Sequence, residues 1–456
     1  MKYDVAVVGA GFSAIAVTIN LMRQLPASAR IAVVGDDPGF GRGTAYRSEF
    51  HLHRLNVPAA RMSIDPEAPD DFLTWLHDHD RAIGGHDFAP RSDFGLYLRD
   101  RLAALLRERD SRAKVDFIKA KAVGCLDIGP ETTLIRLDNG DGLAVKATVL
   151  CLGVGAAPLP LPGDAIAPST RAAIVENPWR LSWLSKVGRH DRVCMLGSGL
   201  TMVDQVLALR ATGHRGQIHV LSRRGLLPHA HEVHHAAAVP PDLPHGDRRL
   251  SALLAHLRRK VREGAPWRAV MDGLRPHTQR LWQELDEAQK ARFLRHGLAW
   301  WTVHRHRLAP DVGESLKELV AQQKICVHAG YLNRIEATDP GVTLSYRKRA
   351  TSTIERLTVD WVVNCTGMER AGIRHSPLLQ AMAGRGQLQG DPLGLGIVVN
   401  GQSQLIARNG ETHRHIYVVG ALTAGRFWEI TAVPDIRVQA HAVARDICGA
   451  LEMAPA

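Results

Sequence analysis

The chain has 456 residues, of which 45% are hydrophobic and 23% are charged, and its formal net charge is +11. This composition is typical of a globular protein of about two or three domains and excludes disordered, collagen-like and coiled-coil chains. No apolar run approaches the roughly 18 residues that a membrane helix needs. The first apolar stretch contains Asp4 and glycines, which fit a strand and a turn better than a signal peptide. The six cysteines show no CxxC spacing, so we expect a cytoplasmic, reducing environment.

The basic charge does not by itself indicate nucleic-acid binding. Lys and Arg are scattered along the chain, without zinc-finger spacing or an RNA-binding strand of aromatic and basic residues. Cofactors that carry phosphate groups account for the positive charge. We therefore expect a small-molecule substrate, no nucleic acid and no membrane, and the sequence leaves the oligomeric state open.

The N-terminal segment combines a strand pattern with a glycine-rich turn. Residues 4–8 (DVAVV) form an apolar run that is typical of a buried parallel strand. Gly9, Gly11 and Ala14 follow at the GxGxx(G/A) spacing, ahead of an apolar helix and a second strand within 15–34. The first glycine permits a tight turn, the second lets the backbone approach a pyrophosphate, and the small third residue lets the helix pack on the strand. This order predicts a dinucleotide site at the positive end of the helix.

The same arrangement recurs in the middle of the chain. The apolar run 192–196 leads into Gly197 and Gly199, which are followed by a helix pattern at 203–209 and a strand pattern at 217–221. A structural glycine turn is the alternative for either motif alone. Two motifs, each between a strand and a helix, favour two dinucleotide sites.

Each motif is followed by a hairpin pattern and then by an apolar strand that ends in a cysteine, Cys151 or Cys365. The first glycine precedes that cysteine by 142 residues in the first unit (151 − 9) and by 168 in the second (365 − 197). The second unit is thus longer by 26 residues (168 − 142), and it contains a loop pattern at 236–246 and a helix pattern with one apolar face at 250–261. These features indicate a duplicated architecture with a helical insertion.

The predicted fold is therefore α/β, with two Rossmann-like dinucleotide-binding modules and a helical insertion. Flavin sites commonly occupy the N-terminal motif, so we expect the first module to bind FAD. The expected FAD-binding domain comprises residues 1–165 and 368–456. The expected NAD(P)H-binding domain comprises residues 166–367, with the helical insertion at about 240–315.

The residue that ends the second strand of each module distinguishes the cofactors. An acid there binds the ribose 2′-hydroxyl, whereas an arginine suits a 2′-phosphate. The second module has Ser222, Arg223 and Arg224 at this place, which favours NADPH over NADH, and two solvated arginines are the alternative. The first module has Gly35 where an acid is expected, so either Asp36 takes over the ribose contact or that contact is missing.

Several further segments resemble a known flavoprotein family. These segments are RGTAY (42–46), LNVPAARM (55–62), GLTMVD (199–204), SRRG (222–225), WTVHRHR (301–307) and WEITAVPDIR (428–437). They are similar to the FAD/NAD(P)-binding family that includes FAD-dependent urate hydroxylase and the aspartate N-monooxygenase that forms nitrosuccinate. More distantly, the chain is similar to ornithine and lysine N-hydroxylases. The resemblance covers nearly the whole chain and is specific for the family but weak for the substrate.

The resemblance implies a flavin-dependent monooxygenase with two cofactors. NADPH would reduce FAD, and reduced FAD would react with molecular oxygen to form a C4a-hydroperoxyflavin. The hydroperoxide would then hydroxylate a small polar, nitrogen-containing substrate, by N-hydroxylation or by urate-type ring hydroxylation. Because the cofactor carries this chemistry, the protein needs no nucleophile–base pair and mainly positions the reactants and excludes water.

The resemblance also implies particular site residues. Asn56, Trp428 and Glu429 are the expected catalytic residues, although Asn56 could instead hold a turn before Pro58 and Trp428 could be a core residue. Pro434 lies early in an expected helix at 434–447, whose N-terminus would stabilise the charge of reduced flavin, an ordinary packing helix being the alternative. The expected cofactor-binding residues are Gly9, Gly11, Ala14, Asp36, Arg42, Tyr46, Asn56, Val57, Met62, Gly153, Gly197, Ser198, Gly199, Leu200, Thr201, Ser222, Arg223, Arg224, Thr366, Gly367, Gly420, Thr431 and Pro434.

A histidine-rich segment, HAHEVHH (229–235), suggests a zinc site at first sight. However, Val233 stands where the metallo-hydrolase motif has a carboxylate, so we expect a polar loop and no metal. The basic segment 304–307 (HRHR) is expected to face solvent or the NADPH phosphates. A metal-dependent hydrolase remains the hypothesis from another enzyme class.

Two other functions use the same cofactors. One is an NADPH:acceptor oxidoreductase or oxidase that inserts no oxygen, and the other is a redox sensor that binds dinucleotides without catalysis. The absence of a CxxC motif argues against a disulfide reductase, and Cys151 and Cys365 at predicted strand ends are expected to be structural.

Overall fold

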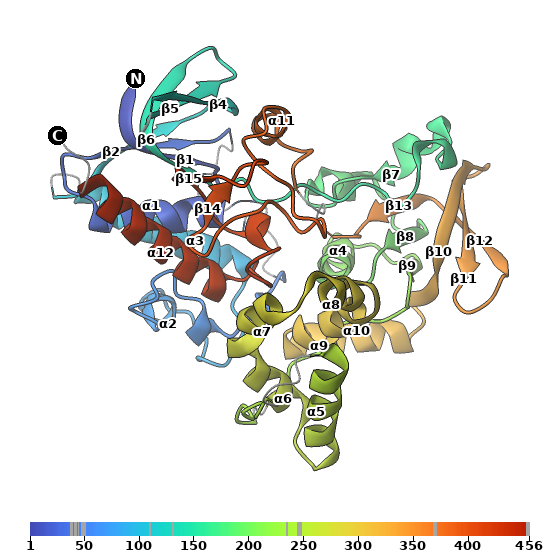
Figure 1. Ribbon diagram of the computed structural model, residues 1–456. Coiled ribbons are helices and arrows are strands. Elements are labelled where there is room, and N and C mark those ends of the chain that lie inside the picture. The colour runs from blue at the N-terminus through green and yellow to red at the C-terminus, as the bar shows by residue number, and fades with distance from the viewer. Residues whose placement is uncertain are drawn as a thin grey trace.

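The computed structural model describes residues 1–36, 40, 43, 45–46, 52–108, 111–129, 132–233, 236–243, 249–367 and 372–452. These residues form two β-sheets with helices packed against them, which lie side by side in Figure 1. The predicted α/β fold with Rossmann-type modules is confirmed.

The first sheet contains the N-terminal and C-terminal strands. Its strands follow the order β14-β15-β6-β1-β2-β3, and β4 and β5 form a hairpin that pairs with β6. The bounds are β1 Lys2–Val8, β2 Arg30–Val34, β3 Lys114–Ile118, β4 Ala122–Gly129, β5 Thr132–Leu137, β6 Gly142–Leu150, β14 Gln404–Ile406 and β15 Thr412–Val418. Strands β1, β2, β3, β6 and β15 pair in parallel, as buried apolar strands joined by crossover connections do.

Helices cover the first sheet. Helix α1 (Phe12–Gln24) packs against the C-terminal helix α12 (Val433–Glu452) and against α3 (Arg91–Arg107), as Figure 1 shows at its left side. Helix α2 (Asp71–Asp78) contacts α3, and α11 (Pro377–Gly384) contacts β4. The expected helix at 434–447 is therefore longer than the pattern indicated, because buried apolar residues continue to Cys448.

The second sheet follows the order β12-β11-β10-β9-β8-β13-β7. Its bounds are β7 Ile174–Val175, β8 Val193–Leu196, β9 Ile218–Ser222, β10 Ile325–Ala337, β11 Val342–Lys348, β12 Ile354–Val359 and β13 Trp361–Asn364. Strands β7, β13, β8, β9 and the start of β10 are parallel, whereas β10, β11 and β12 form an antiparallel meander. Helix α4 (Leu200–Ala211) joins β8 to β9.

A helical segment separates β9 from β10. It contains α5 (Leu250–Arg262), α6 (Trp267–Leu274), α7 (Thr278–Glu284), α8 (Glu287–Arg292), α9 (Leu298–Arg305) and α10 (Pro310–Ala321). In Figure 1, α5 and α6 project at the bottom, away from both sheets. The predicted helix is present as α5, and its apolar face is only partly covered: Leu250, Leu253 and Leu257 are half-buried, whereas Leu254 and Val261 are exposed. Part of this face stays exposed because α5 lies at the edge of the molecule.

No helix within the described ranges is long and apolar enough to cross a membrane.

Candidate functional site

The first glycine turn connects β1 to α1 and packs against the residue that follows β6. Gly9 has a φ of +141°, and a Cβ there would lie 2.3 Å from the backbone oxygen of Cys151, so only glycine fits. Gly11 caps the N-terminus of α1, and no side chain bonds to the first N–H groups of the helix. Ala14 is fully buried, as the predicted contact between helix and strand requires. The turn can therefore receive an anion at the positive end of α1.

The second glycine turn repeats this geometry. Gly197 has a φ of +99°, and a Cβ there would lie 2.4 Å from the backbone oxygen of Cys365. Gly199 caps α4 without a side-chain hydrogen bond, and a Cβ at Gly199 would meet no atom of the described residues within 4 Å. The space before α4, where Leu200 and Thr201 form the first turn, is thus open to a phosphate.

Ser198 and Ser222 connect the second glycine turn to the end of β9. The Ser198 hydroxyl donates to the backbone oxygen of Leu226 at 2.6 Å and lies 3.0 Å from the Ser222 hydroxyl oxygen. The backbone N–H of Gly225 donates to Ser222 Oγ at 3.0 Å. These bonds hold the turn that carries Arg223 and Arg224. Both serine side chains thus have partners within the protein.

The structure explains why the first module has no acid at residue 35. A Cβ at Gly35 would lie 2.8 Å from the Cβ of Ala10, so a side chain at this position would collide with the glycine turn. Asp36 is the next residue, and its carboxylate pairs with Lys121 at 3.3 Å. The acid is therefore displaced by one residue, to the exposed end of β2.

Asn56 lies where the two sheets meet. Its backbone oxygen is 3.3 Å from His231 Nε2, on the segment that follows β9. Asn56 and Leu200 line the same small cavity between the modules. Nearby, Arg91 of α3 pairs with Asp204 of α4 at 2.8 Å, and both side chains are nearly buried. This ion pair, which the sequence did not predict, joins the two modules beside Asn56.

The other expected flavin-side residues belong to the protein core or to its edge. Val57 and Met62 are buried in the first apolar core. Tyr46 packs edge-on against Phe12 and Phe94, with ring centroids 6.0 and 4.7 Å apart. Arg42 lies outside the described residues.

The strand-end loops of the two modules are connected. Gly153 and Gly367 have φ angles of +65° and +104°, and a Cβ at either would meet no atom within 4 Å. The Asn364 side-chain amide donates to the backbone oxygen of Ala157 at 2.7 Å, and Thr366 Oγ1 donates to Asn364 Oδ1 at 2.7 Å. Thr366 and the two glycines therefore lie at the crossing between the sheets.

The C-terminal segment returns to the first glycine turn. A Cβ at Gly420, whose φ is +92°, would lie 2.5 Å from Ser13 Oγ, and the Gly420 N–H donates to Gln439 Oε1 at 2.8 Å. Thr431 is exposed, and Pro434 lies in the first turn of α12. The loop between β15 and α12 is thus fixed against the start of α1.

Trp428 and Glu429 contact the helical segment between β9 and β10. Trp428 stacks on Trp282 of α7, with ring centroids 4.3 Å apart. The Glu429 carboxylate accepts hydrogen bonds from Trp301 Nε1 at 2.8 Å and Arg305 Nε at 3.1 Å, and it lies 3.3 Å from His306 Nε2. Both residues therefore bind the helical segment to the C-terminal segment.

The surroundings of Glu429 keep it ionised. Its side chain is 6% exposed, and its φ is +63°. Burial raises the pKa of the Glu429 carboxyl, but the hydrogen bond with His306 and the charge of Arg305 outweigh burial and lower this pKa to about 2. A carboxylate with this pKa does not exchange protons at neutral pH. In this structure the carboxylate holds Trp301, Arg305 and His306.

In the basic segment 304–307, the two arginines are held in ion pairs inside the protein, whereas His304 and His306 are partly exposed. Arg305 and His306 contact Glu429, and Arg307 pairs with Asp272. Burial of a cation requires an acidic partner. The sequence did not identify this partner because Glu429 lies more than 120 residues further along the chain.

A second ion pair lies beside this cluster. Arg275, just after α6, is 3.7 Å from Asp435 in the first turn of α12. Burial raises the pKa of Asp435 and lowers that of Arg275. The sequence offered no signal for Arg275, whose role depends wholly on how the helical segment folds.

Two described histidines in or near the histidine-rich segment 229–235 pack against an aromatic ring. The rings of His229, His304 and Trp267 pack together, with centroids 4.9 to 5.1 Å apart. Across the described ranges, no group of three or more His, Cys, Asp or Glu side chains could hold a metal ion. His234 and His235 lie outside these ranges.

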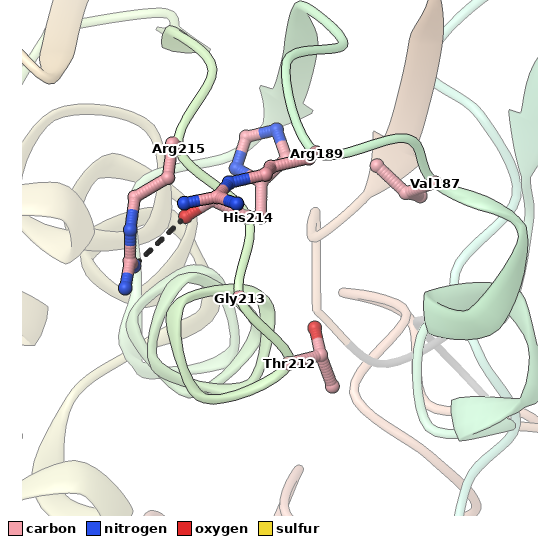
Figure 2. Close-up of a pocket in the computed structure, with 6 residues that line it drawn as sticks. All are labelled: Val187, Arg189, Thr212, Gly213, His214 and Arg215. Carbon is pink, nitrogen blue, oxygen red and sulfur yellow. Dashed lines mark hydrogen bonds between the residues drawn. The ribbon is translucent and has the colours of Figure 1, made fainter.

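A separate surface pocket lies at the other end of α4 (Figure 2). It is lined by Val187, Arg189 and residues 212–215. Helix α4 is about 18 Å long, at about 1.5 Å for each of its twelve residues. This pocket is therefore at the opposite edge of the sheet from the second glycine turn.

Comparisons with known proteins support the architecture. Residues 6–155 match the family described as FAD-NAD(P)-binding. No curated protein sequence matches this chain.

Solved structures match over nearly the whole chain. The ornithine N-hydroxylase of Kutzneria sp. 744 has a TM-score of 0.68 at 14% identity, covering 98% of this chain and 99% of its own. The reduced ornithine hydroxylase of Pseudomonas aeruginosa has a TM-score of 0.65 at 17% identity (99% and 100% covered). The bacillithiol disulfide reductase of Staphylococcus aureus has a TM-score of 0.59 at 12% identity (99% of both chains). The chain therefore has a fold found both in ornithine hydroxylases and in a bacillithiol disulfide reductase.

Proposed function

We propose that this protein is an NADPH-dependent FAD monooxygenase that hydroxylates a small polar, nitrogen-containing substrate. The observation that carries the proposal is the pair of glycine turns, each packed against a cysteine carbonyl and each leading into a helix with an uncapped N-terminus. Their positive helix ends fit two pyrophosphates. The match of residues 6–155 to an FAD-NAD(P)-binding family adds support for the first site.

The ends of the second strands support the assignment of each cofactor. Asp36 has the carboxylate that suits a ribose hydroxyl, so the first module would hold FAD. Arg223 and Arg224 provide the donors that suit a 2′-phosphate, so the second would hold NADPH. Bound FAD would supply the oxygen-transfer chemistry, with electrons from NADPH and oxygen from O₂.

We further propose that Asn56 lies beside both reactive rings. It is placed between the modules, and its backbone contacts the segment that follows the NADPH-side strand. The Arg91–Asp204 ion pair would keep this junction closed. Trp428 and Glu429 would act indirectly, since they hold the helical segment as a wall that excludes water from the reaction.

The substrate class rests on resemblance. The matching structure from Kutzneria sp. 744 is named with reduced FAD, NADP⁺ and L-ornithine, which supports N-hydroxylation. Membership of the family of urate hydroxylase and aspartate N-monooxygenase is proposed from the sequence motifs. We also propose an FAD-binding domain of residues 1–165 and 368–456, an NADPH-binding domain of residues 166–367, and a cytoplasmic location, which the six free cysteines support.

The test uses the purified chain loaded with FAD. NADPH oxidation is measured under ¹⁸O₂ with ornithine, lysine, aspartate and urate in turn, together with hydrogen peroxide release. We expect one substrate to accelerate NADPH oxidation and to acquire one ¹⁸O atom. Complete recovery of the consumed oxygen as peroxide with every substrate would contradict the proposal.

An NADPH:acceptor oxidoreductase is the second candidate, because the same fold occurs in a bacillithiol disulfide reductase. Burial raises the pKa of the Cys151 and Cys365 thiols, so neither provides a thiolate for disulfide exchange. This function predicts rapid anaerobic NADPH oxidation with an added electron acceptor and no ¹⁸O product.

A further inference from the structure

The turn between β11 and β12 brings a third arginine to the end of β9. Arg349 Nη1 donates to the backbone oxygen of Arg223, at 3.4 Å. The backbone N–H of Arg349 donates to the oxygen of Ala329 at 2.8 Å. Ala329 pairs with Ser222 in the parallel register of β10 and β9. Arg349 is therefore held beside Arg223 by both its backbone and its side chain.

The local backbone supports this placement. Ala350 has a φ of +62°, so the hairpin turn closes in the left-handed region, directly after Arg349. A Cβ at Gly225 would lie 3.1 Å from the Cβ of Ala329, which shows how closely the turn after β9 approaches β10. The two turns thus form one compact surface, although they are separated by 126 residues in the chain.

The arginines of this surface are not neutralised by acids. Within the described part of the chain, Arg223, Arg224 and Arg349 form no ion pair, whereas the adjacent Lys348 pairs with Glu355 at 3.1 Å. Arg224 donates to the backbone oxygen of His296 at 3.4 Å and lies 6.0 Å from the Trp300 ring, so it is directed towards the helical segment. Among the described residues, Arg223 and Arg349 thus lie together at the strand end without an acidic partner.

The first module provides a contrast at the equivalent place. There Asp36 follows β2, and Lys121, which follows β3, pairs with it at 3.3 Å. In the first module, Lys121, which follows the neighbouring strand β3, thus balances the charge of Asp36, whereas in the second module Arg349 from the β11–β12 turn adds a second positive charge beside Arg223. Two adjacent arginines without an acid are stabilised by a doubly charged anion, which each can bind through two N–H groups.

We propose that Arg349 is a specificity-determining residue that binds the 2′-phosphate of NADPH together with Arg223. The proposal rests on the proposed function, because it takes NADPH to be the ligand of the second module. It adds a cofactor contact from the β11–β12 hairpin, outside the glycine motif and its strand.

The test measures binding of 2′,5′-ADP and of 5′-ADP by calorimetry to the FAD-loaded protein and its variants. Arg349→Ala should weaken 2′,5′-ADP by about tenfold, as expected for one lost charge-assisted contact, and should leave 5′-ADP unchanged. Arg349→Gln should weaken it similarly while keeping the hydrogen bond to Arg223. Arg347→Ala is the matched control, because Arg347 is on the same hairpin but lies over Tyr331, 4.8 Å from its ring. The Arg347→Ala protein should bind both ligands normally.

Other outcomes separate this proposal from the proposed function. If Arg223→Ala weakens 2′,5′-ADP but both Arg349 variants bind it normally, the role of Arg349 is wrong and NADPH binding stands. If the Arg349 variants weaken both ligands equally, the residue is structural and the proposal also fails. If the unmodified protein binds 2′,5′-ADP no better than 5′-ADP, the NADPH assignment itself is wrong.

Discussion

The two modules have the same backbone turn but opposite charges beside it. The Gly9 N–H donates to Val34 O and the Gly197 N–H donates to Leu221 O, each at 2.8 Å, so Asp36 and Arg223 occupy equivalent positions. In both turns the first glycine packs against a cysteine carbonyl at the end of a parallel strand. We therefore propose that the backbone provides a general pyrophosphate site, whereas one strand-end side chain distinguishes a ribose 2′-hydroxyl from a 2′-phosphate.

The modules also differ in the segment that comes after their second strand. The first continues through α2 and α3 to β3, whereas the second continues through α5 to α10 before β10. The longer segment reaches the C-terminal segment through Trp282, Trp301 and Arg305. A dinucleotide-binding module alone lacks such a segment. We therefore propose that this insertion encloses the space between the two cofactor sites and completes the candidate active site.

Of the substitutions that test the difference between the modules, Gly197→Ala should have the largest effect on flavin reduction by NADPH. The alanine Cβ would collide with the backbone oxygen of Cys365 at a φ that favours glycine. This collision should lower the free energy of unfolding by about 3 kcal/mol or more. We expect normal FAD content but at least about 100-fold slower flavin reduction by NADPH. Gly199→Ala is the control for stability, because its Cβ meets nothing, and it should melt at the wild-type temperature. A wild-type reduction rate in Gly197→Ala would show that the second turn does not bind NADPH.

Glu429→Gln tests the contact that only the second module makes. It leaves the buried Arg305 cation without its acid, at a cost of about 3 kcal/mol in the free energy of unfolding. Glu263→Gln, which removes an exposed partner of Arg259, should change it by less than about 0.5 kcal/mol. Denaturant titration measures both, and equal effects would contradict a structural role for Glu429.

The same variant should change the response to acid. The pKa of Glu429 is about 2 in the folded protein and lies near 4.5 without the fold. Its stabilisation is therefore complete above about pH 4.5 and is lost as the pH falls towards 2. Between about pH 4.5 and pH 2 the wild-type protein should lose more stability than Glu429→Gln. Thermal melts at several pH values measure this loss. If Glu429 were not ionised, the melting temperatures of the two proteins would fall in parallel with pH.

Arg223→Asp converts the strand end of the second module to that of the first. We expect kcat/KM for NADPH to fall by about 10- to 100-fold, since one charge-assisted phosphate contact is lost and replaced by repulsion. The value for NADH should be retained or raised. Steady-state kinetics with each cofactor measure the ratio of kcat/KM for NADPH to kcat/KM for NADH. An unchanged ratio would mean that Arg223 does not contact the 2′-phosphate.

Asp36→Asn should have the smallest effect on stability. The Asp36–Lys121 pair is exposed, so its loss should cost less than about 1 kcal/mol. FAD affinity should nevertheless fall several-fold if Asp36 binds the ribose, and Lys121→Ala should not lower it. Fluorescence titration of the apoprotein with FAD distinguishes the two, and equal affinities would mean that the ribose contact is missing.

Much of the fold was predictable because its signals are local. Buried parallel strands read as short apolar runs, and the glycine turns require particular residues at particular spacings. Helix α5 shows where this reasoning stops: its apolar pattern was present, but Leu254 and Val261 are exposed. Periodicity indicates which face of a helix is apolar, and only the packing decides whether that face is buried.

The sequence by itself determined the two dinucleotide modules, their order and the opposite charges of Asp36 and Arg223. Only the tertiary structure showed that Ala10 excludes a side chain at Gly35, that Glu429 is held by the helical segment, and that Arg349 lies beside Arg223. The physical reason is distance along the chain. The patterns of strands and glycine turns are carried by residues that are close in the sequence, whereas these contacts join residues up to 128 positions apart or depend on how closely two strands approach.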